Sequence, residues 1–188
     1  MNQPKKLFNE TAAKSQGCNL CKESEFEVGK NTGYGFIVGK IGNMKNGWFA
    51  TLSPKTGGDP SKDFSVQLMP IKHLNYFSDI HEDEELAKNY GLVFAKISKA
   101  ISLVIGKEEG KIPIGTYGKC KHEDEHIHVK LFPYRGDIGQ PFTVDSSFEK
   151  KKVHYDGEEF VKMKPVRKVK LSNERFTELS NKLIELLK

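Results

Sequence analysis

Two cysteines separated by two residues, Cys18 and Cys21, are the first feature of this 188-residue chain that could do chemistry. Their spacing suits one tetrahedral zinc ion in a reducing compartment, and three cysteines in all cannot pair completely into disulfides. The remaining ligands must therefore come from elsewhere in the chain. The candidates are the third cysteine and the histidines, namely Cys120, His73, His81, His122, His126, His128 and His154.

Residues 126–132 alternate basic and apolar side chains, as expected of a strand with one buried face. The basic positions lie on one face, about 6.6 Å apart at each step, because successive strand residues point to opposite sides. Protonated neighbours at this spacing would repel one another, which favours a neutral or metal-bound histidine, and a bound phosphate would relieve the repulsion. The basic residues are His126, His128 and Lys130, and the apolar ones expected in the core are Ile127, Val129 and Leu131.

An antiparallel sheet and one long helix are the elements expected to position these residues. Apolar runs bounded by turn residues predict strands at 35–39, 48–52 and 64–69, and an extended segment at 112–117. Apolar residues at steps of three and four predict a helix from Leu86 to Val104, after an acidic first turn. The fold class is therefore α+β.

The C-terminal region is lysine-rich from Glu149 and ends in an amphipathic helix capped by Ser172. We expect this helix to dock on its own sheet, although binding a partner is the alternative. The division expected is an N-terminal tail at 1–17, a domain at 18–148, and a basic segment with the helical extension at 149–188. The basic run 162–170 could contact nucleic acid, but lysines alternating on an exposed strand face are the favoured interpretation.

Charge and hydropathy exclude some classes of protein. The formal net charge of +5 is compatible with partners that carry phosphate and is too small for a protein that coats nucleic acid. The most apolar stretch, 90–106, contains Lys96 and Lys99 and is not a membrane span. The polar N-terminal residues lack the apolar stretch of a secretory signal, so a cytoplasmic location is expected.

A family resemblance rests on three motifs. The sequence His126-Ile-His128-Val-Lys130-Leu-Phe-Pro133 resembles the His-φ-His-φ-His-φ-φ-Pro signature of the histidine-triad (HIT) superfamily of nucleotide hydrolases and transferases. Upstream, the run from Val66 to His73 is similar to the family's apolar strand ending in Pro-x-x-His. The pair Cys18-x-x-Cys21 resembles that of zinc-containing members and of the related galactose-phosphate uridylyltransferases. The order of elements matches across roughly residues 18 to 142.

The resemblance implies a HIT-like antiparallel sheet with a long crossing helix, and a role for each site residue. Zinc would be held by Cys18, Cys21, His73 and His126, a complete tetrahedral set that makes it structural. His128 would be the nucleophile that attacks the α-phosphorus of a nucleotide and forms a nucleotidyl-histidine. Lys130 and Arg135 would contact phosphate oxygens. An alternative ligand set has Cys120 or His122 in place of His73 or His126. HIT proteins often pair into homodimers, and the C-terminal extension of this chain could cover or extend the surface that would pair.

Lys130 departs from the family pattern because it stands where the third histidine is expected. A lysine with an ordinary pKa of about 10.4 is a poor proton acceptor at neutral pH, so we expect it to bind phosphate. The leading hypothesis is a zinc-stabilised nucleotide hydrolase or nucleotidyltransferase acting on a phosphoramidate, a dinucleoside polyphosphate or a nucleotide sugar. The alternatives are a catalytically degenerate protein that binds nucleotide or nucleic acid, and an unrelated metalloenzyme with His126 and His128 as joint ligands.

Overall fold

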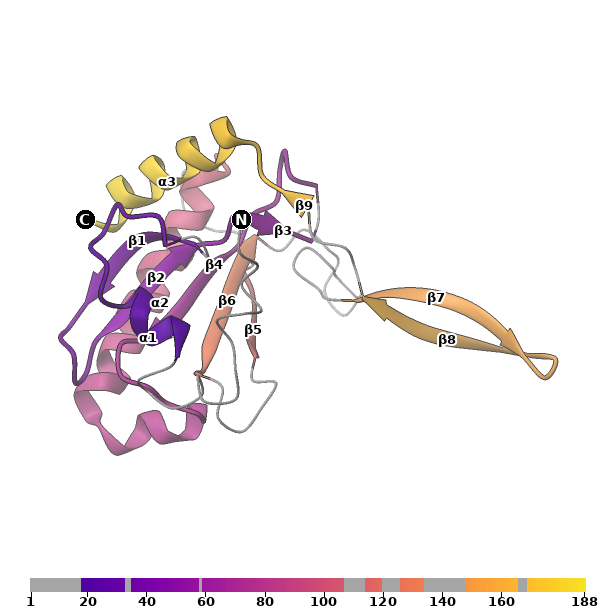
Figure 1. Cartoon of the computed structure of the whole chain (residues 1–188), viewed down its shortest axis with the longest axis horizontal. Helices are drawn as coiled ribbons and strands as arrows, with labels where there is room; N and C mark the ends of the chain where they lie inside the picture. Colours follow the sequence, from indigo (N-terminus) through magenta and orange to yellow (C-terminus); the bar gives the residue numbers. More distant parts are fainter. Residues whose placement is uncertain are drawn as a thin grey trace.

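A five-stranded antiparallel sheet forms the centre of the computed structural model, in the strand order β1-β2-β4-β6-β5 (Figure 1). The structure describes residues 18–32, 35–57, 59–106, 114–119, 126–133, 148–165 and 169–188. The strands of the sheet are β1 (Phe36–Ile41), β2 (Trp48–Leu52), β4 (Val66–Pro70), β5 (Ile114–Lys119) and β6 (His128–Pro133). The expected α+β class is confirmed.

Helix α2 (Glu84–Val104) crosses one face of the sheet, after the short 3₁₀ helix η3 (Phe77–Glu82). It begins at Asp83, whose side chain accepts a hydrogen bond of 3.1 Å from the backbone N–H of Leu86. The buried indole of Trp48 donates to the Leu86 carbonyl at 2.9 Å. The predicted helix is therefore present, and the tryptophan is a core residue that fixes its first turn to β2.

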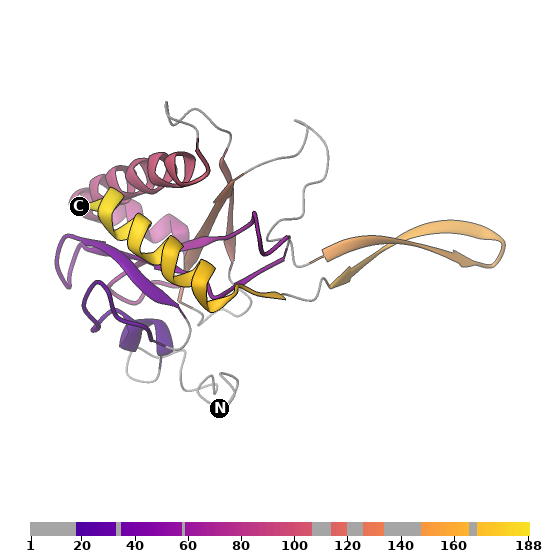
Figure 2. The same cartoon turned by 90° about the horizontal axis from the view of Figure 1, so that it is seen from above.

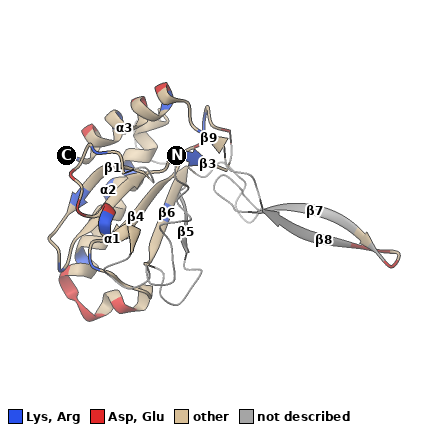
Figure 3. Cartoon of the chain, viewed as in Figure 1, with Lys and Arg blue, Asp and Glu red and all other residues tan. Residues whose placement is uncertain are grey.

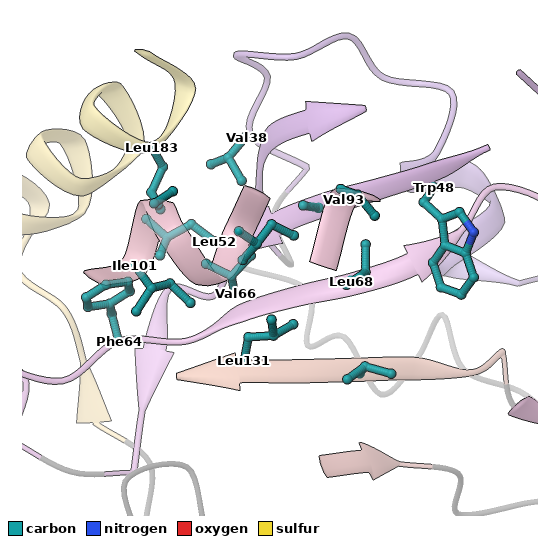
Figure 4. Close-up of a cluster of buried hydrophobic side chains, with 14 of the residues drawn as sticks. Val38, Trp48, Leu52, Phe64, Val66, Leu68, Val93, Ile101, Leu131 and Leu183 are labelled. Atoms are coloured by element: carbon teal, nitrogen blue, oxygen red, sulfur yellow. The ribbon is translucent and has the colours of Figure 1, made fainter. Parts of the chain in front are cut away.

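Helix α3 (Asn173–Leu187) completes this layer, so the expected docking of the C-terminal helix is confirmed. Ser172 caps it by accepting a hydrogen bond of 3.1 Å from the Arg175 N–H. Leu183 is fully buried and lies among side chains of the sheet and α2 (Figure 4). The rings of Phe36 and Phe176 meet edge to face at 6.0 Å between centroids.

The short helix α1 (Asn19–Glu23) lies on the opposite face of the sheet from α2 (Figure 2). A second apolar cluster joins it to the strands, and this cluster consists of Cys18, Leu20, Ile37, Phe49, Met69 and Ile71. Both faces of the sheet are therefore covered near β2 and β4, which fixes the position of the two cysteines relative to the strands.

A hairpin of β7 (Phe148–Tyr155) and β8 (Glu158–Pro165) extends away from the sheet in both views (Figures 1 and 2). The chain returns through β9 (Val169–Lys170), which pairs with β3 (Lys55–Thr56) before α3 begins. The sequence had predicted a basic segment here and not a hairpin. In the described part of the chain, no helix combines the length and apolar character needed to cross a bilayer.

Candidate metal centre

Four residues from three separate segments bring their ligand atoms together beside α1. Cys18 and Cys21 come from the start of α1, His73 from the segment after β4, and His126 from the position two residues before β6 begins. One ligand atom of each lies within 4.8 Å of all the others. These are the four ligands that the family resemblance implies, and their arrangement could hold a metal ion.

Three sulfur–nitrogen distances within the cluster fit tetrahedral coordination. The Nδ1 atom of His126 lies 3.6 Å from Sγ of Cys18 and 3.5 Å from Sγ of Cys21, and Nδ1 of His73 lies 3.4 Å from Sγ of Cys21. Metal–sulfur bonds of about 2.3 Å and metal–nitrogen bonds of about 2.0–2.1 Å at the tetrahedral angle give a sulfur–nitrogen separation of about 3.5 Å. These three sulfur–nitrogen pairs therefore have the spacing that a tetrahedral ion would give.

His126 is oriented for coordination by a hydrogen bond on the far side of its ring. Its Nε2 lies 2.9 Å from the carbonyl oxygen of Pro70, an acceptor, so Nε2 carries a proton and donates it. In the neutral ring this leaves the lone pair on Nδ1, which faces both sulfur atoms. Pro70 is the last residue of β4, so the strand end fixes the tautomer.

His73 packs against His126 with ring centroids 4.8 Å apart and an interplanar angle of 65°. Its Nδ1 faces Cys21, and its Nε2 is buried without a hydrogen-bond partner among the described residues. The backbone near it is held by Ile127, whose N–H donates to the Leu74 carbonyl at 2.9 Å. The two histidines are therefore fixed to each other through the backbone as well as through the cluster.

The two thiols of the cluster have pKa values shifted in opposite directions. A hydrogen bond from the Cys21 thiol, assisted by His126, lowers the pKa of Cys18 to about 3, although burial opposes this. The same contact raises the pKa of Cys21, because removing its proton would place two thiolates side by side. The thiolate is the form of cysteine that binds metals, and a bound cation would favour ionisation of the second thiol as well.

Glu23, at the end of α1, is a buried carboxyl group near this pair. Burial raises its pKa to about 7, and the Thr32 hydroxyl, which donates to Oε1 at 2.7 Å, partly opposes the shift. Sequence reasoning missed this residue, because an acidic side chain in the Lys22-Glu23-Ser24-Glu25 run resembles a solvated surface position. Its hydrogen bond ties α1 to the segment that precedes β1.

His128 is buried two residues beyond the cluster, at the start of β6. Its Nδ1 lies 3.4 Å from the carbonyl oxygen of His126, so a proton on Nδ1 points to that acceptor. In the neutral ring the lone pair is then on Nε2. This is the protonation pattern that a nucleophilic imidazole needs.

Lys130 is also buried and lies opposite Gln67 of β4 in the strand register. Gln67 in turn lies opposite Thr51 of β2, so a lysine, an amide and a hydroxyl occupy one row across three strands. Gln67 is the single polar residue of the run Val66–Pro70, and that irregularity is the signal by which it could have been found.

Some predicted residues cannot be placed. Arg135, Cys120 and His122 lie outside the described residues. His81 and His154, two of the candidate ligands, are exposed and do not belong to the cluster. Comparison of the chain with protein-family models, with curated proteins and with solved structures gave no match in any of the three.

Proposed function

We propose that the chain is a zinc-stabilised nucleotide hydrolase or nucleotidyltransferase in which His128 is the nucleophile. The observation that carries this proposal is the orientation of His128, whose Nδ1 faces the His126 carbonyl at 3.4 Å while His126 itself belongs to the metal cluster. The motif resemblance adds the reaction class.

Zinc is the metal we propose because two cysteines and two histidines form a common structural zinc set. Four protein ligands leave no position for substrate or water, so the ion would supply no chemistry to the reaction beyond holding α1 and β6 in place. The donors also argue against magnesium and calcium, which prefer oxygen ligands.

The proposed reaction has two steps on His128. Nε2 attacks the α-phosphorus of a nucleotide, a phosphorus–nitrogen bond forms, and the bond from phosphorus to the leaving group breaks. The leaving group departs with the electron pair of that bond and takes up a proton from solvent. Water or the hydroxyl group of a second acceptor then attacks phosphorus and loses its proton to solvent, which releases the nucleoside monophosphate group and returns the electron pair to Nε2.

Lys130 would stabilise charge on the non-bridging phosphate oxygens. It lies two residues beyond His128, and an even step along a strand returns to the same face about 6.6 Å away. A cation among buried side chains is a strong donor to a phosphoryl group because little water competes for it. Arg135 stays a predicted contact. The substrate class would be a nucleoside phosphoramidate, a dinucleoside polyphosphate or a nucleotide sugar.

The test is intact-mass spectrometry of zinc-quantified protein, quenched rapidly with a nucleotide panel under non-acidic conditions that preserve phosphorus–nitrogen bonds. We expect a mass increase of one nucleoside monophosphate on the wild type and none on His128→Ala. His81→Ala is the matched control, because this exposed histidine lies outside the cluster and should leave the adduct unchanged.

Two results would overturn the proposal. Nucleotide binding with neither adduct nor turnover would favour a catalytically degenerate binding protein, in which Lys130 keeps a phosphate site without chemistry. Loss of zinc from His128→Ala would favour the unrelated metalloenzyme, because our proposal assigns His128 no metal contact.

A further inference from the structure

The β7–β8 hairpin has an open strand edge on each side in the described part of the chain. The two strands pair over all eight positions, from Phe148 opposite Pro165 to Tyr155 opposite Glu158, and form a sheet of their own. Figures 1 and 2 show the hairpin projecting well beyond the five-stranded sheet. An isolated two-stranded hairpin is at best marginally stable in water, so a further strand would stabilise it.

Charge is segregated along the hairpin. The stem, defined as 148–153 with 160–165, contains five lysines and one glutamate, whereas the tip at 154–159 contains three acidic residues and no lysine. The tip acids are Asp156, Glu158 and Glu159, and they are exposed. Figure 3 shows red at the tip of the hairpin. In an antiparallel pair of hairpins the tip of each would lie beside the stem of the other, so the charges are complementary between two copies of this chain.

The edge of β7 is unsuited to pairing with itself. A two-fold axis perpendicular to a sheet places residue i opposite residue j, with a constant sum of i and j. Lys150, Lys151 and Lys152 are consecutive, so an axis at any of them sets lysine against lysine. Runs of lysine on an edge strand are a common device against such pairing.

The edge of β8 is suited to pairing with β8 of a second copy. The turn residues Asp156 and Gly157 have φ of 52° and 80°, the signature of a two-residue type I′ turn, in which the flanking pair Tyr155–Glu158 is hydrogen-bonded. From this pair onward, hydrogen-bonded and non-hydrogen-bonded pairs alternate along the hairpin. Val161 belongs to a non-hydrogen-bonded pair, so its N–H and C=O point to the outer edge of β8. Pro165 shares that outward parity, which is where proline is tolerated in a strand.

We propose that β8 pairs antiparallel with β8 of a second copy, about a two-fold axis at Val161. This register sets Val161 opposite its equivalent, Phe160 opposite Lys162 and Glu158 opposite Lys164, each pair occurring twice. An axis one residue later sets Lys162 against itself, and an axis one residue earlier shortens the paired segment. Two copies thereby form a four-stranded ribbon in the order β7-β8-β8-β7.

The first test is charge reversal, read out by sedimentation velocity over a concentration series of the full chain. Glu158→Lys and Lys164→Glu each set like charges opposite each other at two symmetry-related places. Each single variant should therefore sediment as a monomer. The double variant restores the opposite-charge pair and regains the dimer. Glu185→Lys, the same charge change at an exposed position of α3, is the matched control and leaves the dimer intact.

The second test reads the register directly. Equivalent residues of a hydrogen-bonded antiparallel pair have Cα atoms about 5.5 Å apart, within disulfide range. Under mild oxidation Val161→Cys forms a cross-linked dimer, whereas Lys152→Cys, its partner on the far strand of the hairpin, does not. Circular dichroism and the melting temperature check that each variant is folded.

Three outcomes overturn the inference. A wild-type chain that is monomeric throughout the series has no such interface. A dimer that survives both single reversals and is not cross-linked through Val161→Cys forms by another surface. A monomer that binds a single-stranded oligonucleotide, with binding lost on neutralising Lys150, Lys151 and Lys152, assigns the hairpin to nucleic acid instead.

Discussion

Replacing both cysteines of the cluster should lower the free energy of unfolding and the melting temperature of the protein. The cluster joins Cys18 to His126 across 108 residues of sequence. Cross-linking a loop of about 100 residues stabilises a fold by about 4.7 kcal/mol in the chain-entropy model. For a domain of this size each kcal/mol corresponds to about 2 to 4 °C in Tm, so the Cys18→Ser, Cys21→Ser double variant should melt on the order of 10 to 20 °C below the wild type.

The assay combines zinc quantification with thermal unfolding followed by circular dichroism. The wild type should hold one zinc per chain, and a chelator should lower its Tm by the same amount as the double substitution does. The double variant should hold no zinc, and its Tm should not change on addition of a chelator. Cys120→Ser is the matched control, because it removes the third cysteine, which is not among the four ligands that the described residues bring together, and should change neither zinc content nor Tm.

Two results would refute this reasoning. Full zinc occupancy in the double variant would show that the ion binds elsewhere. Zinc loss in Cys120→Ser would mean that the alternative ligand set holds the metal in solution.

Three further predictions concern the scaffold. Gly47→Ala should destabilise the fold by about 1 to 3 kcal/mol in urea unfolding, because its Cβ would lie 2.4 Å from the Asn43 carbonyl oxygen and 2.6 Å from Cδ1 of Ile71. Leu183→Ala should cost about 2 to 5 kcal/mol in the same measurement, since the side chain is fully buried between α3 and the core. Glu174 has a pKa lowered by its own backbone N–H and by Ser172, so its contribution to stability is present at neutral pH and lost as pH falls through that pKa. Glu174→Gln should accordingly be less stable than the wild type at pH 7, and urea unfolding over a pH series should show the difference shrinking as the pH falls through the lowered pKa.

The elements with strong periodicity could be predicted from the sequence. Strands β2 and β4 follow from apolar runs bounded by turn residues, since the sheet is covered on both faces there. Helix α2 follows from apolar residues at steps of three and four, since one of its faces is buried. The β7–β8 hairpin was missed because its strands are rich in lysine, although Asp156-Gly157 is a strong hairpin signal. The pairing of β3 with β9 involves two residues on each side, too few for any local pattern.

The residues of the candidate site could be predicted from the sequence, but the contacts that orient their side chains could not. Residue types alone left every histidine open as a ligand, and the motif resemblance selected His73 and His126. The hydrogen bond from His126 to the Pro70 carbonyl could not be foreseen, because it depends on where β4 ends in space. The position of Gln67 opposite Lys130 depends likewise on strand register, which sequence separation does not reveal.

The candidate metal centre and His128 are linked through His126. His126 is held at three points: Nδ1 faces the cysteines, Nε2 donates to Pro70, and its carbonyl oxygen lies 3.4 Å from Nδ1 of His128. An ion bound at the cluster would therefore orient the acceptor that orients the proposed nucleophile. Under the proposed function, loss of the ion would leave the chemistry of the imidazole intact and remove the constraint on its direction. A structural zinc in this place would act on reactivity through position alone, which is why four protein ligands and no open coordination site would suit it.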